Sequence, residues 1–219
     1  MKGNKSAPEI SSLLRLHYPG SKCSLVFANP FECLVSVMLS AQCTDEKVNK
    51  VTPSLFSAYP DPASMSKAPL EDIEAKIHSL GLYKNKAKNL KEASRVLSSL
   101  YQGNVPNDYE ALVSLPGVGN KTARVVLMES FGAPSFPVDT HVGRVSSRLG
   151  LTKEEDSPES KEAKLERLFD KTEQALLHHC FIDFGRDICH SQKPECDRCF
   201  LREFCRYFSV KNKDLRTGK

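Results

Sequence analysis

The stretch that decides the fold reads Leu115-Pro116-Gly117-Val118-Gly119-Asn120-Lys121-Thr122-Ala123. It lies between an expected helix that ends near Ser114 and another that begins near Asn120. Pro116 stiffens the entry, while Gly117 and Gly119 permit a tight turn and a close approach by the backbone of another molecule. The turn therefore delivers free backbone N–H groups at a helix N-terminus, which is a ready binding site for an anion.

The rest of the chain has the apolar spacing of helices nearly throughout. Apolar residues recur three and four positions apart within 31–39, 73–80, 90–100 and 123–130. No convincing alternation of apolar and polar residues indicates a strand. We therefore expect an all-α protein built from many short helices.

Turn and capping residues predict where several of these helices begin and end. Pro69 is expected to open a helix that Gly81 closes, and Asn107 with Glu110 resembles a capping box. Asp139 is expected to cap a helix over 140–149, with Gly150 just past its end. A polar stretch over 153–164 is expected to separate two helical regions.

Lys121 follows the turn directly, in the first turn of the expected helix. The positive end of the helix dipole disfavours a cation there and helps supply a neutral amine. A neutral lysine amine is a nucleophile that forms Schiff bases with carbonyl-like carbons, and C1′ of a nucleotide is such a carbon once its base begins to leave. The alternative is a surface lysine that only pairs with phosphate.

Asp139 has both a structural and a chemical interpretation. As an N-cap it stabilises a helix, typically by about 1 kcal/mol. As a carboxylate near Lys121 it could accept the lysine proton and stabilise positive charge that develops on the sugar. The two roles are compatible in one residue.

Four of the eight cysteines crowd into one short segment near the C-terminus. Cys189, Cys196, Cys199 and Cys205 have the spacing Cys-x6-Cys-x2-Cys-x5-Cys. Four thiolates suit either zinc or a [4Fe–4S] cluster. The spacing matches neither paired Cys-x2-Cys zinc motifs nor the tight repeats of bacterial ferredoxins.

Composition limits the class of protein and its location. The net charge of +4, from 31 basic and 27 acidic residues in a chain of 219, is only mildly basic. Two basic clusters stand out, Lys84, Lys86, Lys88 and Lys91 in one and Lys211, Lys213, Arg216 and Lys219 in the other. The longest apolar run, from Cys33 to Leu39, is far too short to span a bilayer, and no signal-peptide core follows the N-terminus. We therefore expect a monomeric prokaryotic cytoplasmic protein without a membrane partner.

Taken together, these motifs resemble the endonuclease III family of helix-hairpin-helix DNA glycosylases over nearly the full chain. The signposts, in order, are Met38-Leu39-Ser40-Ala41-Gln42 with Thr44-Asp45, Gly81-Leu82-Tyr83, the hairpin, Val138-Asp139-Thr140-His141-Val142, and the four-cysteine segment. The resemblance implies a six-helix barrel domain over 23–134, which contains the helix-hairpin-helix. Residues 1–22 and 135–219 would form a discontinuous helical domain that holds a [4Fe–4S] cluster between 189 and 205.

The resemblance also implies an activity, a bifunctional N-glycosylase and AP lyase acting on damaged double-stranded DNA. Oxidised pyrimidines would be flipped out and excised by a Schiff base on Lys121, with Asp139 assisting, and β-elimination would cut 3′ to the abasic site. Gln42 and Leu82 would fill the space left by the flipped nucleotide, and His141 would lie near the DNA backbone. The hairpin residues expected to contact DNA are Leu115, Pro116, Gly117, Val118, Gly119 and Asn120.

Other functions would require different residues in this sequence. An adenine-mismatch glycosylase would carry a carboxylate where this chain has Ser36 and a serine where it has Lys121. A relative specific for thymine in mismatches shares most of the framework and stays open. A non-catalytic DNA-binding module would use Lys121 only as a cation. An electron-transfer protein would leave most of the chain before Cys189 without a purpose.

Overall fold

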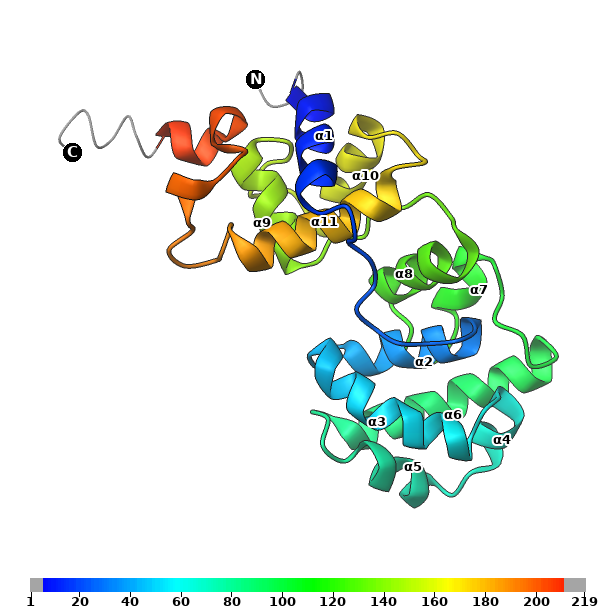
Figure 1. Cartoon of the computed structure of the whole chain (residues 1–219). Coiled ribbons are helices and arrows are strands. Elements are labelled where there is room, and N and C mark those ends of the chain that lie inside the picture. Colours follow the sequence, from blue (N-terminus) through cyan, green and yellow to red (C-terminus); the bar gives the residue numbers. More distant parts are fainter. Residues whose placement is uncertain (1–5, 211–219) are drawn as a thin grey trace. The chain divides into compact units, whose positions relative to one another are not determined.

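The computed structural model describes residues 6–210, and the regular structure of these residues is entirely helical (Figure 1). The expected all-α fold is therefore confirmed. The basic tail residues Lys211, Lys213, Arg216 and Lys219 lie outside the described residues.

The chain divides into two compact units. The continuous unit is Cys23–Ala133, and the discontinuous unit comprises the segments before and after it, described over 6–22 and 134–210. The division falls one residue before the boundary expected from the sequence, so that Pro134 belongs to the discontinuous unit.

The continuous unit is organised around one buried helix. Its helices are α2 (Pro30–Ser40), α3 (Asp45–Ala58), α4 (Pro62–Lys67), α5 (Leu70–Ile77), α6 (Tyr83–Leu100), α7 (Tyr109–Val113) and α8 (Asn120–Phe131). In α2, Phe31 and every residue from Cys33 to Leu39 are buried, which explains the long apolar run. Asn29 starts this helix, because its side chain accepts a hydrogen bond from the Glu32 N–H at 3.0 Å.

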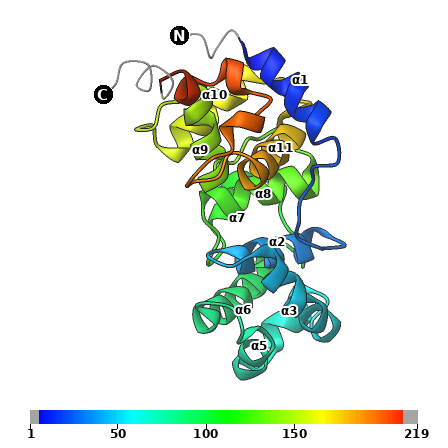
Figure 2. The same ribbon diagram turned by 60° about the vertical axis from the view of Figure 1, so that its left-hand side comes forward.

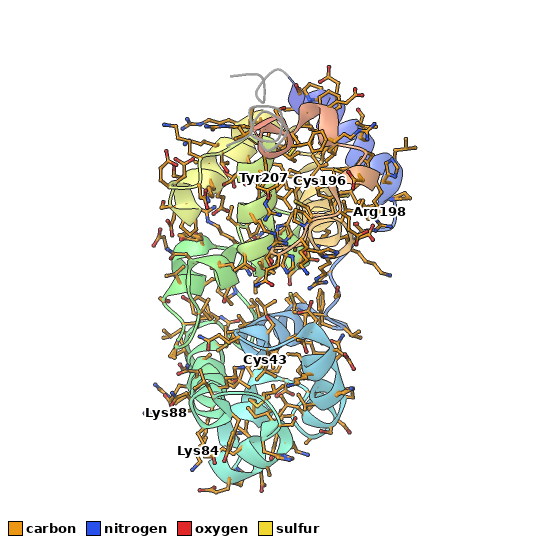
Figure 3. All side chains as sticks on the ribbon, turned by 90° about the vertical axis from the view of Figure 1, so that its left-hand side faces the viewer. Cys43, Lys84, Lys88, Cys196, Arg198 and Tyr207 are labelled. Atoms are coloured by element: carbon orange, nitrogen blue, oxygen red, sulfur yellow. The ribbon has the colours of Figure 1, made fainter. Side chains whose placement is uncertain are left out.

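Two positions on α6 differ from expectation. The apolar residues Leu90, Ala93 and Leu97 are buried as their spacing predicts, but Leu100, in the last turn, is 72% exposed because the helix has passed the end of the core. Lys86 is only 9% exposed, whereas the sequence placed it in a surface cluster. Its neighbours Lys84 and Lys88 are exposed, and Figure 3 shows both at the surface of the unit.

Three helix boundaries also differ from expectation. Pro69 is the N-cap of α5 rather than its first residue, and that helix ends at Ile77, before Gly81. Asp108, not Asn107, caps α7, and its carboxylate accepts from the Ala111 N–H at 2.8 Å.

The discontinuous unit has α11 (Gln174–Asp187) at its centre, accompanied by α1 (Ala7–His17), α9 (Thr140–Leu149), α10 (Pro158–Leu168) and short 3₁₀ turns at Cys196–Arg198 and Arg202–Phe204. Helix α1 packs against α11 (Figure 2). Helix α10 begins within the polar stretch that was expected to separate helices, because Ser157 caps it and Pro158 is its first residue.

An aromatic cluster forms part of the core of this unit. The rings of Phe136, Phe169 and Phe181 lie with centroids 5.4 to 5.9 Å apart, in the range of favourable aromatic pairs. Ile10 and Leu14 of α1 are fully buried in the same core. Among the described residues, no helix is both long and apolar enough to cross a membrane.

Candidate functional site

The hairpin between α7 and α8 is built on a tight turn over 115–118. The Val118 N–H donates to the Leu115 carbonyl at 3.1 Å, with Pro116 second in the turn and Gly117 third, at φ +80°. This is the residue pattern of a type II β-turn, which favours proline second and requires a left-handed third residue. A Cβ on Gly117 would lie 2.7 Å from Cβ and Nδ2 of Asn89 on α6, so the third residue must be glycine for two separate reasons.

Gly119 has a different role from Gly117. It is the N-cap of α8 at φ −94°, and a Cβ there would meet nothing within 4 Å. No side chain caps this helix, and its first internal hydrogen bond runs from the Ala123 N–H to the Gly119 carbonyl at 3.0 Å. The N–H groups of the first turn thus have no partner within the helix. The side chains of Leu115 and Val118 are buried, so only their backbones are available to a ligand.

Lys121 lies in this first turn, where the sequence placed it. Its side chain is exposed, as are Gly119 and Asn120. Among residues 6–210 the Lys121 amine has no hydrogen bond or ion pair, so it is available to an incoming molecule. The hairpin therefore combines an anion-binding helix end with an available primary amine.

Gln42 and Leu82 occupy two strained turns of the same unit. Their φ angles are +56° and +59°, in the left-handed region that favours glycine. Each such residue costs about 1 to 2 kcal/mol in backbone strain, and strain of this kind gathers at functional sites. Both side chains are exposed, Leu82 by 60%, as expected of side chains that insert into a bound molecule.

Asp139 caps α9 as the sequence predicts. Its Oδ1 accepts a hydrogen bond from the Val142 N–H at 2.8 Å, and Gly150 closes the helix in a left-handed conformation at φ +80°. Its other carboxylate oxygen, Oδ2, accepts no hydrogen bond from the described residues. A cap on one oxygen leaves the second available for chemistry. Asp139 belongs to the discontinuous unit and Lys121 to the continuous unit.

His141 is held by an arginine on the next turn of α9. Nη2 of Arg144 lies 3.1 Å from Nδ1 of His141 and 2.9 Å from the Gly185 carbonyl of α11. Burial lowers the pKa of His141, the Arg144 and Arg186 charges lower it further, and Asp139 opposes them. A hydrogen bond to the Gly185 backbone also raises this pKa, so both Arg144 and Gly185 hold the ring in place.

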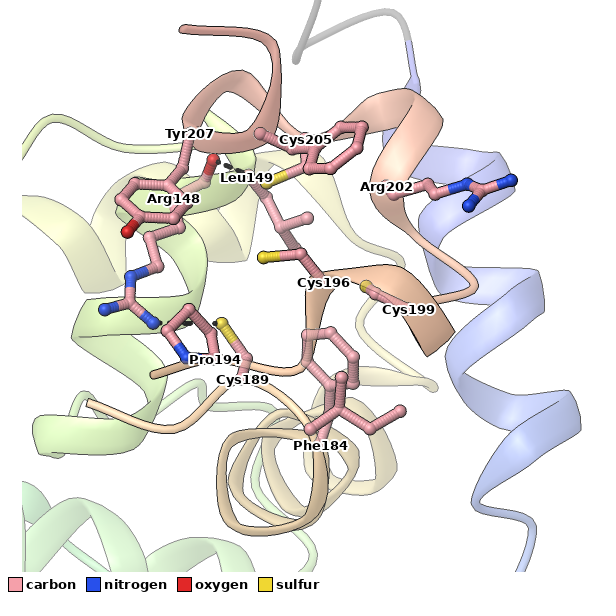
Figure 4. Close-up of a pocket in the computed structure, with 12 residues that line it drawn as sticks. Arg148, Leu149, Phe184, Cys189, Pro194, Cys196, Cys199, Arg202, Cys205 and Tyr207 are labelled. Atoms are coloured by element: carbon pink, nitrogen blue, oxygen red, sulfur yellow. Dashed lines mark hydrogen bonds between the residues drawn. The ribbon is translucent and has the colours of Figure 1, made fainter. Parts of the chain in front are cut away.

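The four clustered cysteines line one cavity. Its empty volume is about 370 Å³, including space open to solvent, and Cys189, Cys196, Cys199 and Cys205 contribute to its wall with Phe184 and Arg148. Figure 4 shows the sulfur atoms of Cys189, Cys196 and Cys205 projecting into the same space from separate segments. All four are free thiols.

These thiols fit a group larger than a single ion. Among the described residues, no three His, Cys, Asp or Glu side chains gather closely enough to hold one metal ion. Burial, together with the neighbouring Cys205, Cys189 and Cys196, raises the pKa of Cys199 to about 11. Four thiolates in this cavity therefore need positive charge between them, which a cysteine-ligated iron–sulfur cluster supplies.

Arg148 organises this loop, and nothing in the sequence singled it out. Its Nη1 donates to the His190 carbonyl at 2.6 Å and to Cys189 Sγ at 3.4 Å, and its guanidinium lies 4.8 Å from the centre of the Tyr207 ring. The Cys205 thiol donates in turn to the Arg148 carbonyl at 3.3 Å. An arginine in the last turn of a helix is common, so it gives no local signal of such a role.

Arg198, between two of the four clustered cysteines, is already paired with acidic side chains. It forms ion pairs with Asp187 at 2.6 Å and with Glu195 at 2.8 Å, so its charge is already balanced. Both acids lie within the segment that forms the cavity, and the arginine braces that segment. Arg202 and Arg206 remain exposed.

Comparison with known proteins agrees with this geometry. Residues 35–171 match the family described as "HhH-GPD superfamily base excision DNA repair protein". "Endonuclease III" of Bacillus subtilis (strain 168) is 48% identical over 189 residues, which cover 86% of each chain.

Two solved structures are also similar. One, described as "Structure of a Trapped Endonuclease III-DNA Covalent Intermediate: Estranged-Adenine Complex", has a TM-score of 0.90 and 43% identity, covering 95% of this chain and 98% of the other. A "thermostable thymine-DNA glycosylase" has a TM-score of 0.86 and 26% identity, covering 94% and 98%. The chain therefore belongs to the HhH-GPD superfamily of base excision DNA repair proteins and, within it, to the endonuclease III family.

Proposed function

We propose that this chain is a bifunctional DNA N-glycosylase and AP lyase that excises oxidised pyrimidines from double-stranded DNA and cleaves the strand 3′ to the resulting abasic site. The observation that carries the proposal is the hairpin. It presents uncapped backbone N–H groups and the available amine of Lys121 side by side at the N-terminus of α8. A module that only binds phosphate needs no nucleophile there.

Lys121 acts as the nucleophile in the proposed reaction. The damaged nucleotide is flipped out of the duplex, and the neutral amine attacks C1′. The new N–C1′ bond replaces the glycosidic bond, and the base leaves with the bonding electrons and takes up a proton. The C1′–O4′ bond of the sugar then breaks as the nitrogen lone pair forms the C=N bond, and O4′ takes up a proton. The resulting open-chain Schiff base makes the proton on C2′ acidic. Loss of that proton expels the 3′ oxygen and breaks the strand.

Asp139 assists through the carboxylate oxygen that does not cap α9. It accepts the proton of the Lys121 ammonium and stabilises the cationic sugar. The cap to Val142 holds the carboxylate in one orientation. His141 contacts a phosphate oxygen through Nε2, since Nδ1 lies against Arg144.

The hairpin, Gln42 and Leu82 bind the DNA. Backbone N–H groups from Gly117 to Asn120 take a phosphate, and Leu115, Pro116 and Val118 hold the turn in shape. Leu82 is an apolar wedge that replaces a stacking partner, and Gln42 fills the remaining space by hydrogen bonds.

We further infer that Cys189, Cys196, Cys199 and Cys205 hold a [4Fe–4S] cluster. When bound, the cluster joins four points of one loop and so stabilises its fold. We also place the protein in the prokaryotic cytoplasm, on the DNA of the nucleoid. The bacterial origin of the similar protein from Bacillus subtilis supports this location.

The decisive substrates are duplexes that carry thymine glycol, an abasic site or a G·T mismatch. The proposal predicts release of free thymine glycol, together with a strand break that ends in a 3′ unsaturated aldehyde. Base release without strand cleavage would contradict the lyase step. Excision from the G·T duplex alone would identify the chain as a thymine-mismatch glycosylase instead.

A further inference from the structure

Lys86 is a buried lysine that the proposed reaction does not use. It lies on α6 and is 9% exposed. Among the described residues its ammonium contacts no carboxylate. Nζ donates instead to the Leu39 carbonyl at 2.9 Å and to Cys43 Sγ at 3.0 Å. Burying a lysine without an acidic partner is costly, so its retention calls for a reason.

Both contacts lie at the end of α2 that leads into the Gln42 turn. Leu39 is in the last turn of α2, where carbonyl groups lack helical partners and the helix dipole favours a cation. Cys43 directly follows Gln42, and its N–H closes that turn on the Ser40 carbonyl at 3.0 Å. Lys86 thus holds the Gln42 turn on both sides.

The backbone of Lys86 holds the second strained turn. Its N–H donates to the Leu82 carbonyl at 3.1 Å, the first helical hydrogen bond after the left-handed Leu82. One residue therefore joins the two turns that carry Gln42 and Leu82. Both turns hold a non-glycine residue at positive φ, a conformation that persists only where its surroundings fix it.

We propose that Lys86 is a positioning residue that sets the spacing of Gln42 and Leu82 for insertion into the DNA duplex. This inference rests on the proposed function of those two side chains. It assigns Lys86 no contact with the substrate. Cys43 serves as the second anchor of the Lys86 ammonium.

The test compares duplex with single-stranded DNA, each carrying one abasic site. Cleavage of the single strand needs the Lys121 chemistry but no wedge, because no partner strand has to be replaced. Lys86→Met keeps the length of the side chain and removes the ammonium. We expect it to lower duplex cleavage by about tenfold or more, the effect of losing hydrogen bonds from a charged group, and to leave single-strand cleavage unchanged.

A double-mutant cycle separates positioning from a general structural role. If Lys86 acts through the inserting side chains, Lys86→Met causes no further loss in a protein that already carries Gln42→Ala and Leu82→Ala. Three results would each overturn the inference. Lys86→Met could lower cleavage equally on duplex and single-stranded DNA, could lower cleavage as much in the double-variant background as in the unmodified protein, or could leave duplex cleavage unchanged.

A second pair of variants covers the case in which Lys86→Met fails to fold. Cys43→Ala removes one anchor of the ammonium, whereas Cys43→Ser keeps an acceptor. We expect the ratio of duplex to single-strand cleavage to fall in the alanine variant and to be preserved in the serine variant. Equal ratios in both would refute the role of the anchor. If the unmodified protein cleaves neither DNA form, the proposed function fails, and that result is distinct from failure of the Lys86 inference.

Discussion

The two hairpin glycines allow the DNA contact to be separated from the stability of the fold. Gly117→Ala places a methyl group on a residue at φ +80° and within 2.7 Å of Asn89. Gly119→Ala places the same methyl group where nothing lies within 4 Å, at φ −94°. The substitution is identical, the positions are two residues apart, and only one of them is crowded.

The expected magnitudes follow from this contrast. A left-handed alanine costs about 1 to 2 kcal/mol, and overpacking against Asn89 adds about 1 to 3 kcal/mol. A loss of about 3 kcal/mol corresponds to roughly 6 to 12 °C in Tm for a chain of this length. At Gly119, alanine is a poorer N-cap by about 1 kcal/mol but reduces the entropy of the unfolded chain by a similar amount. The net change in stability is therefore close to zero.

The assay pairs thermal unfolding with DNA binding at fixed salt. Gly119→Ala should melt like the unmodified protein and bind duplex DNA at least about tenfold more weakly, because the methyl group blocks the approach of a phosphate to charge-assisted N–H donors. Gly117→Ala should lower both the Tm and the affinity for duplex DNA. Unchanged affinity in the Gly119 variant would show that no phosphate sits at the start of α8, and an unchanged Tm in the Gly117 variant would refute the crowding argument.

Three further predictions concern the discontinuous unit. Asp139→Asn should keep Tm, because asparagine also caps the Val142 N–H, and should abolish base excision, whereas Asp139→Ala should lose about 1 kcal/mol of stability as well. Burial holds the pKa of His141 below its ordinary 6.5, so the unfolded chain takes up this proton first as pH falls. The stability of the unmodified protein should therefore decline below about pH 6.5 relative to His141→Gln, as measured by urea unfolding across pH. Cys199→Ser should lower the iron and sulfide bound per protein and destabilise this unit. Cys180→Ser, in the core and away from the loop, should leave the bound iron and sulfide unchanged.

Local sequence was sufficient to predict the structure where a residue interacts with its neighbours in the chain. The cap by Asp139, the helix end at Gly150 and the start of α8 at Asn120 follow from short-range capping and turn rules, and the structure confirms them. The buried stripe of α2 follows from its apolar spacing. These signals need no knowledge of which segments meet.

Sequence reasoning failed where the environment comes from distant segments. Lys86 looks like a surface lysine because its neighbours are basic, and only the packing of α6 on α2 buries it. Arg148 contacts residues about forty positions away in sequence, a separation that no local pattern reveals. The sequence alone does not pair Arg198 with Asp187, eleven positions away, whereas the folded loop brings them together.

The most direct test of the whole account is borohydride trapping on a duplex that carries one thymine glycol. Reduction of a Schiff base would join the protein covalently to DNA, and mass spectrometry of the digested adduct would place the link on Lys121. Lys121→Gln should abolish the adduct while DNA binding persists. Base excision without a trapped adduct, or an adduct that survives in Lys121→Gln, would contradict the assignment of Lys121 as the nucleophile.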